Sequence, residues 1–334
     1  MRFAIIGATG IVGQEIIKCL EKIQASVTAL RLVASVKSEG KIIETIFGKI
    51  KVEIINEEVF KNSDIVFFAA GSEISITWVK KAVELGSIVI DNSSCFRYDV
   101  DVPLVIPEIN PQEIFTHKGI IANPNCTTAI ASIPLWVIKE NFGLKKIIVS
   151  TYQAVSGAGN SAMKELEKQV CDYSQGNKLE IKKFQHQILF NLIPHIDTFQ
   201  ENNYTREEMK VVWEIQKIFK DKKISISCTA VRIPVMRAHS ESIVVETKKK
   251  ISPEKTRALF KKTAGIKVVD DPKKNLYPMP LFASNDYSVH VGRIRQSLVF
   301  GNYGIEFFVS GDQLLKGAAL NAVQIAEILI KNKF

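Results

Sequence analysis

Short apolar runs alternate with amphipathic segments along the first third of the chain. The amphipathic segments are the stretch after Gly10 and residues 74–85, and the apolar runs around them are Phe3 to Ile6, Leu30 to Ala34, Ile65 to Ala69 and Ile88 to Ile90. Such an alternation is typical of βαβ units, in which helices join parallel strands. We therefore predict a parallel sheet in this part of the protein.

The pattern changes from about Lys145, where the apolar and polar residues alternate over longer segments. Within one of these segments, one side carries Ile224, Ile226, Cys228 and Ala230, and the other side carries Ser225, Ser227 and Thr229. A period of two predicts strands, and here we expect a mostly antiparallel sheet. The last segment, Asp312 to Lys331, has apolar residues at helical spacing and predicts a long amphipathic helix.

The length of 334 residues also favours two domains, because it exceeds what one hydrophobic core usually holds. We place the first domain at residues 1–122 and the second at 123–311, where the pattern changes. The C-terminal helix, at about 312–334, is able to pack on either domain, including back onto the first.

Composition argues against several classes of protein. No apolar run reaches the roughly 18 to 20 residues that span a bilayer, and the opening MRFAIIGATG enters a folded motif rather than a cleavable signal. The five cysteines are odd in number and include no CxxC pair, which argues against a disulfide framework and against a metal site. We expect a cytoplasmic protein without a metal and without membrane association.

The formal charge of +9 suits nucleic acid in principle. The lysines, however, are scattered or lie in short runs such as Lys248 to Lys250, without a basic stripe that carries interleaved aromatic residues. We therefore expect no nucleic-acid partner. A positive field also attracts small anions, so the charge is compatible with a phosphorylated substrate.

Three glycines form the motif GATGIVG directly after the first apolar run, at Gly7, Gly10 and Gly13. A tight turn followed by exposed N–H groups at a helix N-terminus is where a dinucleotide pyrophosphate binds. The motif predicts a Rossmann-type dinucleotide-binding domain. Beside the glycines, we expect the cofactor to contact the other residues of the turn, which are Thr9, Ile11 and Val12.

The end of the second predicted strand indicates which dinucleotide is used. NAD-binding proteins usually place an acid there to bind the ribose 2′-hydroxyl, whereas this chain has Ser35, Val36, Lys37 and Ser38, and no carboxylate before Glu39. A cation with two hydroxyls suits a 2′-phosphate. We therefore predict NADP, with Ser35, Lys37 and Ser38 at the phosphate, although Lys37 also fits the pattern of a solvated loop lysine.

Cys126 is the candidate nucleophile. Residues 120–122 end a predicted strand, Asn-Pro-Asn follows, and the apolar segment from Ala129 predicts a helix whose N-terminus holds Cys126. A helix N-terminus favours thiolate over thiol, and its N–H groups stabilise an oxyanion. The apolar neighbours of Cys19 and Cys228 indicate buried, unreactive cysteines instead.

A reactive thiol needs a proton partner, and His239 in RIPVMRAHSES is our preferred acid/base. It follows a strand that carries Arg232 and is flanked by small polar residues. The other histidines are His117 in a loop, His186 and His195 in a polar connecting region, and His290 in a possible strand. The residues alone do not decide between catalytic and structural roles for these side chains.

At these residues the chain resembles the aspartate-semialdehyde dehydrogenase family, and the resemblance runs essentially from end to end. The ordered motifs that carry it are GATGIVG at 7–13, DNSSCFR at 91–97, NPNCTT at 123–128, TYQAVSGAG at 151–159, EEMK at 207–210, RIPVMRAHSES at 232–242 and VGRIR at 291–295. The resemblance implies an NADP-binding domain, an α+β catalytic and dimerisation domain, and a two-fold homodimer.

The resemblance also implies roles for single residues. The nucleophile falls on Cys126, the acid/base on His239, and the glutamine that orients substrate and nucleophile on Gln153. The substrate's carboxylate, amine and phosphate are assigned to side chains that match the family's pattern: Arg232 for the carboxylate, Glu207 for the amine, and Arg97, Lys210 and Asn125 for the phosphate. Ser156 and Gly157 are expected at the cofactor. Where Lys37 stands, the family commonly has an arginine, and a lysine lacks the planar fork that binds phosphate bidentately.

The implied reaction is the NADPH-dependent reductive dephosphorylation of 4-phospho-L-aspartate to L-aspartate 4-semialdehyde, through a thioester on Cys126. Its product is a precursor of lysine, threonine and methionine, and phosphate is released. Two alternatives are reduction of N-acetylglutamyl phosphate and a catalytically silent paralogue on the same fold. An acetylated nitrogen needs no acid, so Glu207 favours a substrate with a free amine.

Overall fold

The protein consists of two compact units in the computed structural model, which describes residues 1–22 and 27–332. The first unit comprises Met1–Asn125 and Gly317–Phe334, and the second comprises Cys126–Lys316. The pattern change in the sequence places the corresponding divisions at residues 122 and 311. Residues 333 and 334, the end of the expected C-terminal helix, lie outside the described residues.

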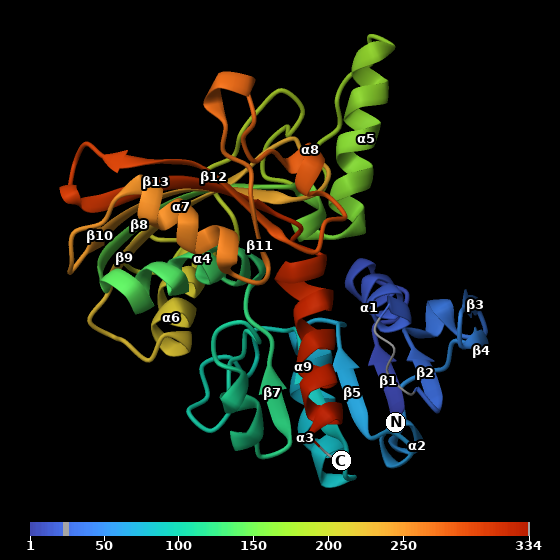
Figure 1. Cartoon of the computed structure of the whole chain (residues 1–334). Helices are drawn as coiled ribbons and strands as arrows, with labels where there is room; N and C mark the ends of the chain where they lie inside the picture. Colours follow the sequence, from blue (N-terminus) through green and yellow to red (C-terminus); the bar gives the residue numbers. More distant parts are fainter. Residues whose placement is uncertain (23–26, 333–334) are drawn as a thin grey trace. The chain divides into compact units, whose positions relative to one another are not determined.

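The first unit is built on a parallel sheet, as the alternation of apolar and amphipathic segments predicts. Its strands are β1 (Arg2–Ile6), β2 (Ala29–Val33), β5 (Ile65–Phe68), β6 (Ile88–Asp91) and β7 (Ile120–Ala122), with β3 (Ile42–Thr45) and β4 (Gly48–Lys51) forming a separate hairpin. Its helices are α1 (Ile11–Lys22), η1 (Val36–Ser38), α2 (Glu57–Lys61), α3 (Ser72–Glu84), η2 (Pro111–Thr116) and α9 (Leu320–Lys331). The strand order is β2-β1-β5-β6-β7, and every neighbouring pair is parallel (Figure 1).

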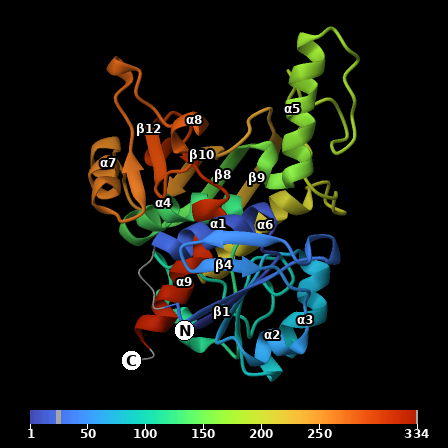
Figure 2. The ribbon, with the colours of Figure 1, turned by 90° about the vertical axis from the view of Figure 1, so that its right-hand side faces the viewer.

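Helices cover both faces of this sheet. The connections β1-α1-β2 and β5-α3-β6 run in opposite directions along the strand order, so the right-handed crossover rule places α1 and α3 on opposite faces. Helix α9 contacts α1, and α2 contacts α3 (Figure 2). All four residues of β5 are buried as a result, which is typical of a parallel strand covered on both sides.

The C-terminal helix begins later than the predicted residue 312. The Asp312 carboxylate accepts hydrogen bonds from the backbone N–H groups of Leu314 and Leu315, so Asp312 caps the helical segment instead of starting it. A π-helical turn over Leu315–Ala319 follows, and the α-helix starts at Leu320.

The second unit contains one large sheet with helices packed on it. Its strands are β8 (Leu144–Gln153), β9 (Ser225–Arg232), β10 (His239–Thr247), β11 (Ile266–Val268), β12 (Val289–Ser297) and β13 (Gly301–Gly311). Its helices are α4 (Cys126–Phe142), η3 (Val155–Ala158), α5 (Asn160–Ser174), α6 (Arg206–Ile218), α7 (Pro253–Lys262), η4 (Pro272–Lys274) and α8 (Pro280–Ala283). The sheet order is β11-β12-β13-β10-β8-β9.

The sheet is mixed, with three antiparallel and two parallel pairs of strands. The antiparallel pairs are β12-β13, β10-β13 and β8-β10, as expected. The pairs β8-β9 and β11-β12 are parallel. The alternation of residues predicts half-buried strands in either case, so the pattern alone does not fix the direction of a partner.

Helix α4 covers one face of this sheet, together with α6 and α7 (Figure 1). A Cβ atom built on Gly311 would lie 3.0 Å from the side chain of Ile130, which shows how closely α4 approaches β13. Most residues of β8, β9 and β10 on this face are buried, including Thr151, Cys228 and Glu241. Within the described residues, no helix is long and apolar enough to cross a membrane.

Candidate active site

Three strand ends meet at one edge of the large sheet, on the face that α4 covers. Strands β8 and β9 are parallel and end at Gln153 and Arg232, which are register partners. Strand β10 is antiparallel to β8, so its first residue, His239, lies at the same edge. All three side chains are buried. The topology thus gathers three of the predicted site residues from separate parts of the sequence.

Cys126 is the first residue of α4, as the sequence predicts. It is partly exposed, whereas Cys19 and Cys228 are buried. The next residue, Thr127, accepts a hydrogen bond of 2.6 Å from Gln153 Nε2, which links the start of α4 to the end of β8. The charge of Cys126 also acts on the pKa of Arg232, which places the thiol within electrostatic range of that guanidinium.

The side chain of His239 is fully buried and makes one hydrogen bond within the described residues. The backbone N–H of Ala154 donates to its Nδ1 at 3.0 Å, and its Nε2 has no hydrogen-bond partner among residues 1–22 and 27–332. A neutral ring that accepts at Nδ1 carries its proton on Nε2. Burial and the positive charge of Arg232 lower the pKa of His239 to about 3, against a smaller opposite effect of Glu207. The imidazole is therefore neutral in the ligand-free protein.

Arg232 ends an apolar face of β9 and points the same way as Cys228 and Ala230, as its strand parity predicts. Its Nη1 donates to the carbonyl oxygen of Ala154 at 2.6 Å. Burial lowers the pKa of Arg232, although Glu207 and Cys126 act in the opposite direction. Among the described residues, no carboxylate forms an ion pair with this guanidinium.

A chain of polar contacts leads from Gln153 to the surface. Gln153 Nε2 also donates to Glu207 Oε1 at 3.0 Å, and Lys210 Nζ donates to Glu207 Oε2 at 3.0 Å and to Asp197 Oδ2 at 2.8 Å. Glu207 and Lys210 lie one turn apart on α6 and form an i, i+3 ion pair. The Oε1 atom of Gln153 is buried and has no hydrogen-bond partner in the part of the chain that the structure describes.

The peptide between β8 and η3 orients two of these side chains. Its residue Ala154 donates to His239 and accepts from Arg232. A Cβ atom on Gly157 would lie 3.0 Å from His239 Nε2 and 3.1 Å from Arg232 Nη1, so the turn packs directly against both groups. Ser156 is buried, and its hydroxyl accepts a hydrogen bond from Gln313.

Two predicted substrate residues belong to the first unit, where both are buried. The guanidinium of Arg97 donates to the carbonyl oxygens of Asn123 and Asn92, each at 2.8 Å. The amide of Asn123 is in turn bonded to Asn92 and Asn321. The Asn-Pro-Asn segment that contains Asn125 is therefore anchored within its own unit.

The glycine motif forms the turn between β1 and α1. Gly10 N donates to Gly7 O at 2.9 Å, and a Cβ atom on Gly13 would lie only 2.2 Å from that oxygen. Thr9, Ile11 and Val12 are half-buried at this turn. The N–H groups at the start of α1 lie at this turn and suit an anion.

The predicted 2′-phosphate residues follow β2. Ser35 and Lys37 are exposed, Lys37 lies in the short helix η1, and Ser38 Oγ lies 3.5 Å from Thr9 Oγ1. Thr9 and Ser38 thus join the glycine turn to the segment that carries Lys37.

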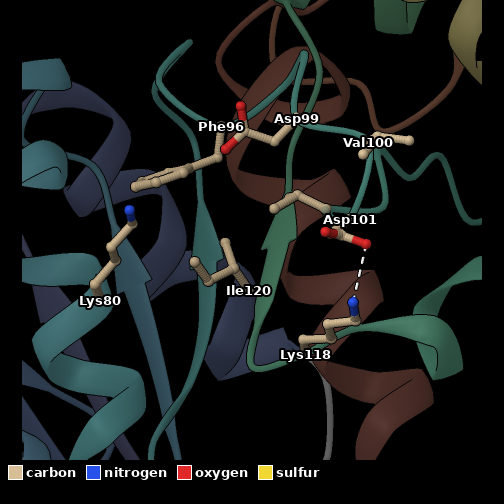
Figure 3. A pocket seen from close by; sticks show the side chains of 8 residues that line it. Lys80, Phe96, Asp99, Val100, Asp101, Lys118 and Ile120 are labelled. Carbon is tan, nitrogen blue, oxygen red and sulfur yellow. Dashed lines mark hydrogen bonds and ion pairs between the residues drawn. The ribbon is translucent and has the colours of Figure 1, made fainter.

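A separate pocket of about 420 Å³ lies in the first unit, and it is lined by Lys80, Phe96, residues 99–102, Lys118 and Ile120 (Figure 3). Lys118 forms an ion pair of 2.9 Å with Asp101, and both side chains are mostly exposed. The pocket contains none of the predicted site residues. Among the described residues, no cluster of three or more His, Cys, Asp or Glu side chains is arranged to hold a metal ion.

Sequence reasoning did not find two contributors to this arrangement. Asp197 lies in a connecting segment without periodicity. The one sequence feature that could have identified it is its position shortly before the EEMK motif of α6. Ala154 acts through its backbone, which every residue possesses, so no side-chain pattern reveals its role.

Comparison with known proteins places these residues in a family. Residues 2–117 match the model of the semialdehyde dehydrogenase NAD binding domain, and residues 136–316 match that of the semialdehyde dehydrogenase dimerisation domain. The aspartate-semialdehyde dehydrogenase of Aquifex aeolicus is 48% identical over 334 residues, covering 99% of this chain and 98% of that protein. The chain belongs to the aspartate-semialdehyde dehydrogenase family. The resemblance seen in its motifs is thereby confirmed.

Other members of the family are also similar to this chain over their full length. The Bacillus subtilis protein of the same name is 42% identical, with 99% of this chain and 98% of that protein covered. Aspartate semialdehyde dehydrogenase II from Vibrio cholerae, solved in complex with ASA, is 41% identical with a TM-score of 0.97, covering 100% of this chain and 99% of that chain. The Candida albicans enzyme, solved with NADP, is 25% identical with a TM-score of 0.77, and 98% of each chain is covered.

Proposed function

We propose that the protein catalyses the NADPH-dependent reductive dephosphorylation of 4-phospho-L-aspartate to L-aspartate 4-semialdehyde. The observation that carries this proposal is the group of buried side chains beside the start of α4. Among the described residues, Nε2 of His239 and Oε1 of Gln153 have no hydrogen-bond partner, and the buried Arg232 makes no ion pair. Buried polar groups are normally satisfied, so this arrangement is suited to a polar ligand.

In this proposal, the Cys126 thiolate attacks the acyl carbon, a thioester forms, and phosphate leaves with the electrons of the broken acyl–oxygen bond. The helix dipole of α4 and the charge of Arg232 both favour the thiolate. The N–H groups at the start of α4 stabilise the oxyanion that develops during attack. When bound, NADPH supplies the hydride that reduces the thioester.

His239 exchanges a proton with the substrate oxygen as the resulting hemithioacetal forms and collapses. Its Nε2 is the available atom, because Ala154 occupies Nδ1. Part of the low pKa of His239 comes from the positive charge of Arg232. An anionic substrate bound at Arg232 offsets that charge, which raises the pKa of His239 toward the range where it acts as an acid or base.

The substrate's charges match those of the site. We assign the α-carboxylate to Arg232, the α-ammonium group to Glu207, and the phosphate to Lys210 with Arg97 and Asn125. Gln153 contacts both Thr127, next to the nucleophile, and Glu207, so it is placed to orient substrate and nucleophile together.

We assign the cofactor to the first unit and propose NADP. The close approach at Gly13 leaves no room for a side chain, which fits the tight turn that a pyrophosphate requires. Thr9, Gly10, Ile11 and Val12 would line it, and Ser35, Lys37 and Ser38 would meet the 2′-phosphate. The absence of an acid between β2 and Glu39, and the NADP in the Candida albicans structure, support this choice. Ser156 and Gly157 would meet the cofactor's reactive end.

The alternative substrate, N-acetylglutamyl phosphate, is less well matched. Its acetylated nitrogen carries no charge, so Glu207 would lose the cation that the proposal gives it. The full-length relatives named above are aspartate-semialdehyde dehydrogenases. We further propose a cytoplasmic homodimer that contributes to lysine, threonine and methionine biosynthesis.

The test is a direct assay in the reverse direction. Purified protein is given aspartate semialdehyde or N-acetylglutamate semialdehyde with phosphate and either NADP or NAD, and reduced cofactor is followed by its absorbance. We expect turnover with aspartate semialdehyde that depends on phosphate and is faster with NADP. Preference for the acetylated aldehyde would overturn the substrate, and no turnover with either aldehyde would indicate a silent paralogue.

Cys126→Ala should abolish this turnover and leave NADP affinity nearly unchanged, because the thioester needs the sulfur. Cys228→Ala is the matched control, since Cys228 is buried in the same unit and contributes packing. We expect Cys228→Ala to lower the melting temperature but to keep the chemistry. Near-normal activity of Cys126→Ala would contradict the mechanism.

A further inference from the structure

Lys210 is held between two carboxylates, although only one of them belongs to the assigned substrate contacts. Its Nζ donates to Glu207 Oε2 at 3.0 Å and to Asp197 Oδ2 at 2.8 Å. The lysine side chain is 13% exposed and that of Asp197 is 31% exposed. The pair of Asp197 and Lys210 is thus partly screened from water, and it is shorter than the pair with Glu207.

The fold fixes the position of Asp197 from both sides. Before it, Ile193 exchanges two backbone hydrogen bonds with Arg232, of 2.8 and 2.9 Å. After it, Arg206 N at the start of α6 donates to Thr198 O at 2.7 Å. Asp197 itself adopts a left-handed backbone with φ of 71°, and its Oδ1 accepts from the N–H of Thr198 at 2.8 Å. The short segment that carries Asp197 is therefore hydrogen-bonded to β9, which ends at Arg232, and to the start of α6. This segment directs Oδ2 of Asp197 to Lys210.

The charges of the proposed substrate indicate what the contact between Asp197 and Lys210 does. Under the proposed function, the substrate brings an ammonium group to Glu207 and a phosphate to Lys210. The ammonium group and Lys210 then compete for one carboxylate. A lysine that had only Glu207 as a partner would either exclude the ammonium group or lose its own position when the substrate binds. A lysine has three N–H donors, so one bond to a second acid leaves two donors for a phosphate.

We propose that Asp197 is a positioning residue that holds Lys210 at the phosphate subsite while Glu207 binds the substrate's ammonium group. This inference rests on the proposed function, because it takes the ligands of Glu207 and Lys210 from it. Asp197 does not touch the substrate in this arrangement. It acts through Lys210 and frees Glu207 for the substrate.

The test uses Asp197→Asn in the full-length protein. Asparagine keeps the size of the side chain and its acceptor for the Thr198 N–H, so the loop should be retained, but it removes the charge that holds Lys210. We expect KM for phosphate in the reverse reaction to rise on the order of tenfold, since a hydrogen bond to a charged group is lost, with a smaller change in kcat. Asp197→Glu, which keeps the charge, should recover part of the loss.

A second readout is the pH dependence of phosphate use. Burial alone would lower the pKa of Lys210, but Glu207 and Asp197 outweigh it and raise this pKa. Removing one of the two acids lowers the pKa again, so the alkaline loss of kcat/KM for phosphate should begin at lower pH in Asp197→Asn. A purely structural defect would reduce activity without changing the pH at which this alkaline loss of kcat/KM begins.

The control variants separate the possible outcomes. Asp101→Asn removes the exposed ion pair with Lys118 and should leave all constants unchanged. In a Lys210→Ala background, Asp197→Asn should add nothing to the rise in KM for phosphate, because its partner is gone. An unchanged KM for phosphate, or a rise confined to KM for the aldehyde, would overturn the role of Asp197. Absence of turnover in the unaltered protein would instead refute the proposed function, so the two failures are distinguishable.

Discussion

Arg232 is a buried cation whose direct contact is a backbone carbonyl oxygen. Such a group is costly to bury unless a charged partner joins it, and in our proposal that partner is the substrate's α-carboxylate. A guanidinium binds a carboxylate through two parallel N–H donors, which a lysine cannot reproduce. We therefore predict that Arg232→Lys lowers kcat/KM by on the order of tenfold to a hundredfold, as expected when a charged hydrogen bond is lost.

The matched control for this substitution is Arg2→Lys. Arg2 pairs with Asp64 at the surface of the first unit, where its side chain is 45% exposed, so the same chemical change should have almost no effect on kinetics. Steady-state rates and melting temperatures of both variants test whether Arg232 binds the substrate or only stabilises the fold. If Arg232→Lys loses activity only in proportion to a drop in melting temperature, Arg232 is structural and the substrate assignment loses its main support.

Glu241 is a fully buried acid, and within the described part of the chain its two carboxylate oxygens have no hydrogen-bond partner. Burial raises its pKa well above the ordinary value, so the folded state keeps the proton that the unfolded state releases. The stability that Glu241 contributes is therefore present at low pH and is lost as the pH rises toward its folded pKa. Glu241→Gln removes this titration with little change in shape.

We predict that Glu241→Gln gains stability relative to the unaltered protein between pH 5 and about pH 8, because only the glutamate loses stability as the pH rises. Melting temperatures over this range measure the difference, with about 2–4 °C expected for each kcal/mol. Glu180→Gln, at an exposed acid paired with Lys182, should show a much smaller change. If the melting temperatures of Glu241→Gln and the unaltered protein changed with pH in parallel, Glu241 would have the same pKa in the folded and unfolded states, and the prediction would be wrong.

At the scale of elements, the turn between β1 and α1 is a test of close packing. A Cβ atom on Gly13 would meet Gly7 O at 2.2 Å, whereas one on Gly10 would meet the same atom at 3.2 Å. Gly13→Ala should therefore displace α1 and lower the free energy of unfolding by roughly 1–3 kcal/mol, together with a loss of NADP affinity. Gly10→Ala should destabilise the protein less. Equal stability of the two variants in a denaturant titration would contradict this account of the turn.

The sequence predicts an element well where the period of its apolar residues, or its position after a motif, defines it. The burial of Cys228, Ala230 and Arg232 follows directly from the period of two in β9, and the start of α4 at Cys126 follows from the apolar segment after NPN. The parallel pairing of β8 with β9 does not follow from either strand, because a strand's own pattern is the same for both directions of its neighbour.

The candidate site shows the same division between local and distant information. The motifs and the family resemblance brought in Gln153, Glu207 and Lys210, and the fold places them in one hydrogen-bonded chain. Asp197 joins that chain through a loop without periodicity, fixed by backbone bonds to Arg232 and α6 that no local pattern encodes. Side-chain chemistry is thus more readily predicted than the backbone and loop contacts that orient it.

At the scale of the whole molecule, the second face of the large sheet is where we expect a second copy of the chain. On β8 the residues alternate, so Gln153 and Thr151 face α4 while Tyr152 and Ile148 face the other way. Ile148 is 46% exposed, and Val244 and Phe308 on neighbouring strands are half-buried. These residues lie within the part of the chain that matches a dimerisation domain. Exposed apolar side chains on a sheet face are typical of an interface.

We therefore predict that Ile148→Asp weakens self-association, because it places a charge among apolar side chains that the dimer would bury. Sedimentation velocity at several concentrations should show a dimer for the unaltered protein and a larger monomer fraction for the variant. Ile76→Asp is the control, since Ile76 is an exposed isoleucine of α3 in the first unit and is not part of the sequence that matches the dimerisation domain. A monomeric unaltered protein would contradict the dimer itself, whereas dissociation by Ile76→Asp alone would move the interface to the first unit.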